Sequence, residues 1–182
     1  MNTALLIVDI QRDYFPGGKM ELVGTEKASG QAGRILAFFR GKKLPVFHVQ
    51  HISTRPDAAF FLPDTEGVSI HDAVAPISDE IVIRKHFPNS FRDTELQDIL
   101  QKKQIQRLVI CGMMSHMCID ATVRAAFDHG YACIVVHNAC ATRALSFNGM
   151  EIPADHVHGA YMAALGAVYA KVLSVDETID ML

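Results

Sequence analysis

Short apolar runs rich in β-branched residues recur along the chain, and they constrain its fold more than any other feature. Each run is continuously hydrophobic rather than alternating, which is typical of parallel strands buried on both faces. Segments with helical patterns lie at 26–43, 93–104, 118–130 and 153–170, before the second, fourth, fifth and sixth runs. This alternation predicts an α/β fold, a three-layer α/β/α sandwich around a six-stranded, mostly parallel, doubly wound sheet. The six runs are TALLIVD, LPVFHVQ, EIVIRK, RLVICG, ACIVVH and KVLSV.

The segment that begins at Cys118 has a clear helical pattern. Asp120, Arg124 and Asp128 recur at i+4 spacing along one side, where opposite charges stabilise a helix. Gly130 follows the last turn as a C-terminal stop. The sequence therefore predicts a helix that starts at Cys118, with one stripe on the sheet and the other in water. The apolar stripe comprises Ile119, Thr122, Val123, Ala126 and Phe127.

The length and charge of the chain predict one small domain and exclude some partners. With 182 residues, 49% of them hydrophobic, residues 1–182 suit a single domain with one core. The net charge is −3 and basic residues are scattered, so we expect no nucleic-acid or membrane partner. The first apolar run has no basic segment before it and is cut short by Asp9, unlike a signal peptide. We therefore expect a cytoplasmic protein.

Most of the cysteines and histidines have structural interpretations. Without an export signal or a CxxC pair, the four cysteines are predicted to be reduced thiols, and a zinc site is not expected. Three of them sit within or just after apolar runs and are interpreted as small buried side chains. The histidines form no HExxH motif and no cluster with ligand spacing. Those interpreted as structural or surface residues include His48, His51, His156 and His158, and the three buried cysteines are Cys111, Cys133 and Cys140.

One segment, residues 51–76, does not fit the alternation of strand and helix. It has no clear period and contains three prolines, and it is longer than most connections in compact domains. A loop of this length is either disordered or functional. The pair Phe60 and Phe61 within it favours an ordered lid or a subunit contact.

Three chemically active side chains lie where predicted strands end. Asp9 ends the first run, Lys85 ends the third, and Cys118 follows the fourth after a short turn. In open α/β sheets, ligands bind at the carboxyl ends of the strands, where the strand order reverses. We therefore expect an acid, an amine and a thiol to meet at one edge of the sheet.

These three groups suit nucleophilic catalysis. A helix N-terminus and a neighbouring ammonium both lower the pKa of a thiol, so Cys118 is predicted to be an activated nucleophile. Asp9 would accept its proton and later pass it to a leaving amine, while Lys85 keeps the pair oriented. Backbone N–H groups at the start of the helix would bind the negative oxygen of a tetrahedral intermediate. His116, two residues before Cys118, is expected to line the pocket.

With these residues in view, the chain resembles the isochorismatase-like cysteine hydrolases, the superfamily that includes nicotinamidases, several small-amide amidohydrolases and isochorismatase. The resemblance covers nearly the whole chain. Three motifs carry it: LLIVDIQRDYFPGG, VIRKHFPNSF and GMMSHMCIDATVRAAFDHGY. The third is the most specific, because its glycine, turn, cysteine, threonine, arginine and Gly-Tyr pair all have the family's spacing.

The resemblance implies roles for several residues. It implies a catalytic triad of Asp9, Lys85 and Cys118, the same three residues that the strand ends indicate. It also implies a cis peptide bond between Met113 and Met114, which would direct the N–H groups of Met114 and Cys118 into an oxyanion hole. The pocket residues that it implies are Gln11, Tyr14, Phe15 and Phe91.

Departures from the family pattern narrow the expected function. Nicotinamidases carry a metal-binding Asp-x-His element after the second strand, where this chain reads HVQHIST, so we expect no metal and no cofactor. Members that cleave the vinyl ether of isochorismate often lack the cysteine. Retention of Cys118 therefore favours hydrolysis of a small amide, ureido or imide C–N bond through a thioester. The resemblance also implies a homo-oligomer, a dimer or a tetramer, that acts on a small molecule.

Two alternatives remain open from the sequence. In one, Asp9 protonates a vinyl ether directly, as a general acid, and the cysteine is dispensable. In the other, the protein is not an enzyme but a binding or thiol-sensing protein with an oxidisable cysteine. Asn138 occupies a position where many relatives have Asp. The sequence therefore leaves the structure of that edge of the pocket open.

Overall fold

The computed structural model describes residues 1–182 and has a six-stranded sheet in the order β3-β2-β1-β4-β5-β8. Every pairing between neighbouring strands is parallel. Each apolar run of the sequence forms one of these strands, which confirms the predicted sheet. The strands are β1 (Thr3–Val8), β2 (Val46–His51), β3 (Ile81–Lys85), β4 (Arg107–Met113), β5 (Ala132–Ala141) and β8 (Lys171–Leu173).

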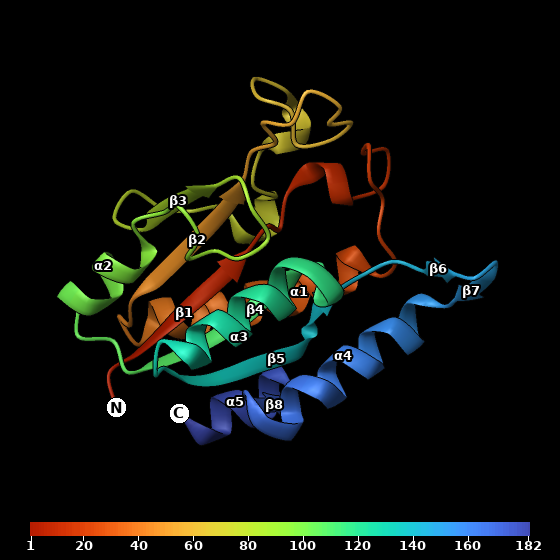
Figure 1. Cartoon of the computed structure of the whole chain (residues 1–182). Helices are drawn as coiled ribbons and strands as arrows, with labels where there is room; N and C mark the ends of the chain where they lie inside the picture. Colours follow the sequence, from red (N-terminus) through yellow and green to blue (C-terminus); the bar gives the residue numbers. More distant parts are fainter.

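Helices cover both faces of the sheet, as the three-layer prediction requires (Figure 1). On one face, α1 (Thr25–Gly41) packs against β5 and against α5 (Val175–Met181). On the other, α3 (Asp120–Asp128) and α4 (Ala154–Val168) contact each other, and they pack on β5 and β8 respectively. The short α2 (Leu96–Lys102) connects β3 to β4. No helix in this structure combines the length and the apolar character needed to cross a membrane.

The last helix, α5, was not among the predicted elements, although its N-terminus carries a recognisable signal. Ser174 Oγ accepts from the N–H of Glu177 at 3.2 Å, and Glu177 Oε2 accepts from the N–H of Ser174 at 2.7 Å. This reciprocal pair is a capping box, which satisfies backbone donors that the first turn leaves free. The spacing of Ser174 and Glu177 in the sequence could therefore have predicted where α5 begins.

The strand order reverses between β1 and β4, at the centre of the sheet. From β1 the chain moves outward to β2 on one side, and from β4 it moves outward to β5 on the other. The two central strands pair closely, with Val8 opposite Gly112. Gly112 has a φ of +134°, and a Cβ atom there would lie 1.9 Å from the carbonyl oxygen of Val8. Only glycine fits at this position, just before the turn that leads to Cys118.

The helix after β4 differs from its prediction at its start and at one residue of its buried stripe, whereas Gly130, with a φ of +88°, follows its last turn as predicted. Cys118 lies inside a π-helical turn, η4 (Ser115–Ile119), and α3 starts only at Asp120. Phe127, assigned to the buried stripe, is 40% exposed and packs edge-on against the ring of Tyr169. The rest of the stripe is buried, as predicted. Arg124 and Asp120 form the expected i+4 ion pair, with Nε and Oδ1 2.9 Å apart.

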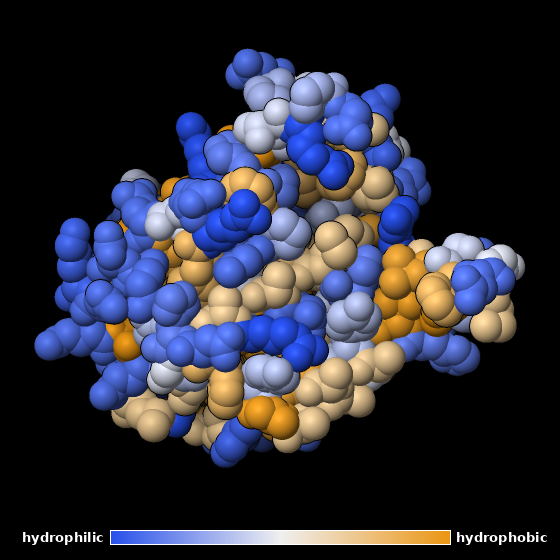
Figure 2. Space-filling view, in the orientation of Figure 1, coloured by the Kyte–Doolittle hydropathy of each residue, from blue (hydrophilic) through white to orange (hydrophobic).

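Two further segments belong neither to the main sheet nor to its covering helices. The long loop at 52–80 is ordered around two short 3-10 turns, η2 (Glu66–Val68) and η3 (Asp72–Val74), and a third turn, η1 (Arg12–Tyr14), lies beside it. A hairpin of β6 (Leu145–Phe147) and β7 (Met150–Ile152) projects from the body (Figure 1). Apolar side chains gather on and beside this hairpin (Figure 2), where Phe147 and Met150 are 64% and 65% exposed.

Candidate active site

Asp9, Lys85 and Cys118 meet at the carboxyl ends of β1, β3 and β4. Lys85 Nζ lies 2.7 Å from Asp9 Oδ2, and both side chains are completely buried. Cys118 Sγ lies within 4.8 Å of a carboxylate oxygen of Asp9, and the charges of Asp9 and Lys85 both act on the thiol. Apart from the ion pair, neither oxygen of Asp9 has a hydrogen-bond donor in the protein. The carboxylate can therefore accept a proton from the thiol.

The ammonium of Lys85 is held on several sides. It donates to the carbonyl oxygens of Phe87 and Pro88, each at 3.1 Å, and its Nζ lies 3.4 Å from His51 Nδ1. Burial alone would lower the pKa of Lys85, but the charge of Asp9 and the contact with Cys118 raise it. Lys85 therefore remains an ammonium in this buried position.

The pKa of Cys118 is shifted in the opposite direction from the sequence expectation. Burial raises the pKa of the thiol, the negative charge of Asp9 raises it further, and Lys85 only partly opposes this. The expected helix N-terminus is absent, because Cys118 sits within η4 rather than at the start of α3. Cys118 in the free protein is therefore a neutral thiol, and its activation requires transfer of the proton to a base.

The backbone before the thiol has the geometry that the family resemblance implies. The peptide bond between Met113 and Met114 is cis, which confirms that prediction. Met114 lies between β4 and η4, and its N–H donates to no protein acceptor. Next to it, the fully buried Ser115 has its Oγ 2.8 Å from Nδ1 of His158 on α4. His158 thus has a definite structural role, because it ties α4 to the turn that carries Cys118.

A cavity of about 280 Å³ lies over Cys118. Its walls are mostly apolar and aromatic, and the long loop supplies one side of them. The loop therefore covers the site of its own chain, and Phe61 is only 1% exposed. Tyr14 and Phe61 pack edge-on, with ring centroids 4.6 Å apart. The lining residues are Tyr14, His51, Ser53, Thr54, Arg55, Phe60, Phe61, His86, Phe87, Pro88, Met114, Met117 and Cys118.

Of the predicted pocket residues, only Tyr14 lines this cavity. Gln11 is buried, but its amide is used by the backbone: Nε2 donates to the carbonyl oxygens of His51 and Val68, and Oε1 accepts from the N–H of His51. Phe15 faces a different cavity. Phe91 packs against His129 and Tyr131, with ring centroids 4.9 and 6.2 Å away. Gln11, Phe15 and Phe91 do not line this cavity, and their predicted roles in substrate binding stay predictions.

His116 is also directed away from the cavity, contrary to the expectation from its position near Cys118. Its Nδ1 lies 2.5 Å from Thr142 Oγ1, and its ring packs edge-on towards Tyr161. The π-helical turn places His116 and Cys118 on different sides. Conversely, His51, which the sequence analysis treated as structural, lines the cavity beside Lys85. Burial lowers the pKa of His51 to about 4, so its imidazole is neutral at pH 7.

The other histidine and cysteine interpretations agree with the structure. His48 is 1% exposed, and its Nε2 lies 2.8 Å from Glu80. His156 is exposed. Cys111, Cys133 and Cys140 are buried and unpaired, and burial raises the pKa of Cys133 and Cys140 to about 12. Asn138 does not reach the cavity, because its Oδ1 accepts from the N–H of Val175 at 3.0 Å.

Asp9, His51 and Cys118 each offer a possible metal ligand, and these atoms lie within 4.8 Å of one another. Oxygen, nitrogen and sulfur ligands of this kind suit Zn²⁺. The ammonium of Lys85, however, already neutralises Asp9 at 2.7 Å, and its positive charge opposes a divalent cation at the same place. We therefore do not assign a metal to this trio.

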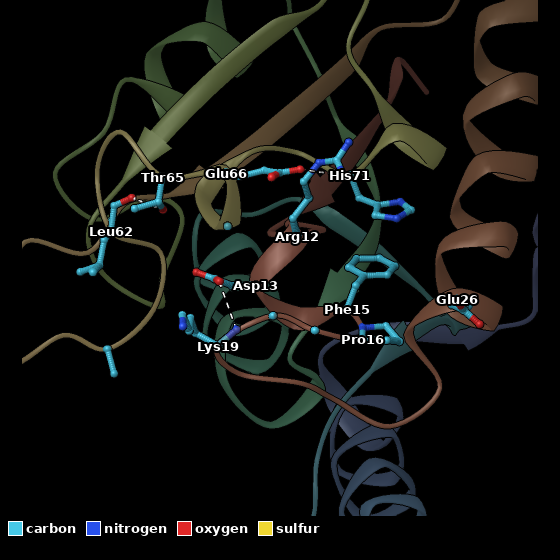
Figure 3. Close-up of a pocket in the computed structure, with 14 residues that line it drawn as sticks. Arg12, Asp13, Phe15, Pro16, Lys19, Glu26, Leu62, Thr65, Glu66 and His71 are labelled. Carbon is cyan, nitrogen blue, oxygen red and sulfur yellow. Dashed lines mark hydrogen bonds and ion pairs between the residues drawn. The ribbon is translucent and has the colours of Figure 1, made fainter.

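A larger, more polar cavity of about 570 Å³ lies on the other side of η1. Figure 3 shows Arg12, Phe15 and His71 along one wall and Leu62 and Thr65 from the long loop along the other. None of its lining residues is a nucleophile beside a base. We therefore assign the candidate site to the smaller cavity, which is lined by Cys118 and lies beside the buried Asp9–Lys85 pair.

Asp13, between the two cavities, holds the long loop in place. Its Oδ2 accepts from the N–H of Phe61 at 2.6 Å and its Oδ1 from the N–H of Lys19 at 3.2 Å; the latter bond is drawn in Figure 3. A Cβ atom on Gly67 would lie 2.1 Å from Oδ1. The carboxylate therefore fixes two segments of the chain around Tyr14.

Replacement of Asp13 is expected to loosen the loop. Asp13→Ala leaves the buried N–H of Phe61 without a partner, which typically costs about 1–3 kcal/mol. We expect that loss in the free energy of unfolding and faster proteolytic cleavage within 52–80. Asp72→Ala is the matched control, because Asp72 pairs with Arg12 at the surface and such pairs contribute less than about 1 kcal/mol. Equal losses and equal cleavage rates in the two variants would contradict this role for Asp13.

The switch point of a parallel α/β sheet thus holds a thiol beside a buried acid–amine pair, a set of groups that suits a cysteine hydrolase. A family model described as the isochorismatase domain matches residues 3–176. The chain therefore belongs to the isochorismatase family, and it is a hydrolase.

Similar proteins support this assignment. An uncharacterised isochorismatase family protein from Bacillus subtilis is 56% identical over 97% of this chain and 98% of its own length. The crystal structure of a proposed isochorismatase hydrolase from Oleispira antarctica superposes with a TM-score of 0.95, at 52% identity over 98% of this chain and 96% of the other. Maleamate amidohydrolase from Pseudomonas putida is 28% identical over 77% of this chain and 72% of its own length.

Proposed function

We propose that the protein is a metal-independent amidohydrolase that cleaves a small amide, ureido or imide C–N bond through a thioester on Cys118. One observation carries the proposal: a buried Asp9–Lys85 ion pair adjoins a neutral thiol at the floor of a small cavity. A sensor thiol needs no matched base. An acyl-transfer nucleophile does, because only the thiolate attacks a carbonyl carbon.

Attack begins with a proton transfer. The thiol proton moves to Asp9, and the sulfur adds to the carbonyl carbon to give a tetrahedral intermediate with a negative oxygen. The Met114 N–H, which has no acceptor in the protein, and the N–H of Cys118 would stabilise that oxygen. Each donor of this kind typically contributes about 3–4 kcal/mol to transition-state stabilisation.

Asp9 then acts as an acid. It returns the proton to the nitrogen, the C–N bond breaks, and ammonia or an amine leaves an acyl thioester on Cys118. Water, deprotonated by Asp9, adds to the thioester. Collapse of the second intermediate releases a carboxylic acid and restores the thiol. Throughout, the Lys85 ammonium keeps positive charge beside the changing charges of the other two residues.

The relatives support C–N cleavage over other hydrolyses. Maleamate amidohydrolase acts, by its name, on an amide, and it matches most of this chain. The family name refers to a vinyl ether substrate, for which protonation by Asp9 alone would suffice. This chain has a thiol beside its acid–amine pair, and only the amide reaction needs such a nucleophile.

A screen for ammonia release tests the proposal. The purified protein is incubated with small primary amides, ureides, cyclic imides and nicotinamide, with and without added EDTA. We expect ammonia from a subset of the primary amides or ureides, at rates that EDTA does not change. Release of no ammonia from any compound by a folded protein would overturn the proposal.

A further inference from the structure

The imidazole of His51 gives the wall of the active-site cavity a hydrogen-bond donor without a partner. Its Nδ1 lies 3.4 Å from the ammonium of Lys85, so a proton on Nδ1 would direct a positive N–H towards a cation. The proton of the neutral ring therefore lies on Nε2. This Nε2 forms no hydrogen bond within the protein, and it is not sealed from solvent. It can donate to a molecule in the cavity.

His51 is held firmly in this position. The side chain of Gln11 binds both of its backbone groups: Oε1 accepts from the N–H of His51 at 2.8 Å, and Nε2 donates to its carbonyl oxygen at 2.9 Å. His51 also lies directly opposite Lys85 in the pairing of β2 with β3. The ring of Phe61 packs against the imidazole, with centroids 5.8 Å apart. A donor on such a rigid support is suited to positioning a reacting molecule.

An amide substrate gives this donor no free acceptor during acylation. An amide nitrogen offers only N–H donors, and the carbonyl oxygen is bound by the N–H groups of Met114 and Cys118 in the proposed mechanism. An acceptor arrives when the amine has left and water takes its place. A ring nitrogen of His51 lies within 4.8 Å of Cys118 Sγ and of an Asp9 oxygen. A water bound to the ring, about 3 Å away, is therefore close to the thioester and to its base.

We propose that His51 positions the water that hydrolyses the thioester, through a hydrogen bond from its Nε2–H to the water oxygen. The inference rests on the proposed thioester mechanism and assigns a residue to its second half. The water gives one proton to Asp9 as its oxygen bonds to the acyl carbon. The carbon–sulfur bond then breaks, and Asp9 returns the proton to the sulfur of Cys118. His51 keeps its own proton throughout, and it serves deacylation rather than acylation.

The ester p-nitrophenyl acetate, used with hydroxylamine, separates the two halves of the reaction. The ester acetylates Cys118 with loss of nitrophenolate, a leaving group that needs no proton from Asp9. In excess hydroxylamine the acetyl thioester is consumed rapidly, so the rate of nitrophenolate release measures acylation. At lower concentrations the thioester partitions between acetohydroxamate and acetate, and the ratio of these products measures hydrolysis by water. The Cys118→Ala variant supplies the background reaction with other side chains.

Two polar substitutions isolate the contribution of Nε2. His51→Asn can still accept from Lys85, but it has no donor at the position of Nε2, whereas His51→Gln extends an amide nitrogen to that position. For His51→Asn we expect a ratio of acetohydroxamate to acetate about 100-fold above wild type, with acylation within about 3-fold, because misplacement of a reacting group has effects of this size on the step concerned. His51→Gln should recover about 10-fold of the loss, the contribution of one hydrogen bond. His156→Leu, at an exposed position of α4, is the control and should match wild type.

The possible failures are distinguishable. An unchanged product ratio in His51→Asn, or equal slowing of acylation and hydrolysis, would overturn the role of His51 and leave the amidohydrolase proposal standing. Equal ratios in His51→Asn and His51→Gln would show that the Nε2 donor is not responsible. If the wild-type protein releases no nitrophenolate beyond the Cys118→Ala background, no thioester forms, and both proposals fall.

Discussion

Cys118→Ala is expected to lower kcat/KM for an amide substrate by about 10⁴- to 10⁶-fold, since removal of the nucleophile from a coupled catalytic set has effects of this size. Without the sulfur no thioester can form, and Asp9 has no thiol proton to accept. Rates of ammonia release at several substrate concentrations measure the loss. The thermal unfolding midpoint should change little, because the substitution removes one small buried atom.

Cys133→Ala provides the matched control. Cys133 is also a buried thiol, 6% exposed, within β5 and outside the cavity lining. This variant should keep wild-type turnover. If Cys118→Ala retains full activity and Asp9→Asn is inactive, the protein uses the acid-only mechanism of vinyl ether hydrolysis and the thioester account is wrong.

The Asp9–Lys85 pair is expected to affect activity and stability separately. Asp9→Asn keeps the shape of the side chain but removes the base, which typically costs about 10²- to 10⁴-fold in kcat. It also leaves the buried ammonium of Lys85 without a counter-charge. Loss of one partner from a buried ion pair typically costs about 3–5 kcal/mol of folding free energy. Lys85→Met should be destabilised similarly, because it leaves the carboxylate of Asp9 unpaired.

The double variant Asp9→Asn with Lys85→Met separates the two effects. Replacement of a whole buried pair by uncharged side chains is often close to neutral, so the double variant should be more stable than either single variant. Its activity should remain as low as that of Asp9→Asn. Urea unfolding of the four proteins gives the coupling free energy. Additive stability losses would show that the two side chains do not interact as a pair, whereas recovery of activity in the double variant would show that Asp9 is not the base.

The sequence predicted the parts of the fold that depend on pattern. A short continuous apolar run rich in β-branched residues is typical of a buried parallel strand, and each of the six runs forms a strand of the main sheet. Parallel strands bring their carboxyl ends to one edge, and for this reason Asp9, Lys85 and Cys118 could be placed together from positions far apart in the chain. The family motifs led to the same three residues.

The walls of the site could not be predicted in the same way. Residues 51–76 have no period, and the course of this loop is set by tertiary hydrogen bonds to Gln11 and Asp13. The contributions of His51 and Arg55 to the cavity follow from that course. The sequence suggested His116 instead, because this residue lies two positions before Cys118. The π-helical turn that directs His116 elsewhere leaves no signal in the apolar pattern.

The pKa of Cys118 was predicted in the wrong direction for a related reason. Neighbouring charges can be inferred from the strand ends, but the depth of burial cannot. Desolvation is the largest influence on this thiol, and Asp9 adds to it. Because its pKa is raised, the resting Cys118 is a neutral thiol rather than the predicted thiolate. It loses its proton to Asp9 as it attacks. The predicted homo-oligomer and the cytoplasmic location stay predictions.

Acid quenching during turnover, followed by intact-mass and peptide mass spectrometry, tests the central claim most directly. With an amide substrate identified by ammonia release, the account predicts that a fraction of the protein gains the mass of the acyl group. This mass should lie on the peptide that contains Cys118, and it should be absent from Cys118→Ala. An acyl group found on another residue, or undiminished turnover without any adduct in Cys118→Ala, would contradict the account.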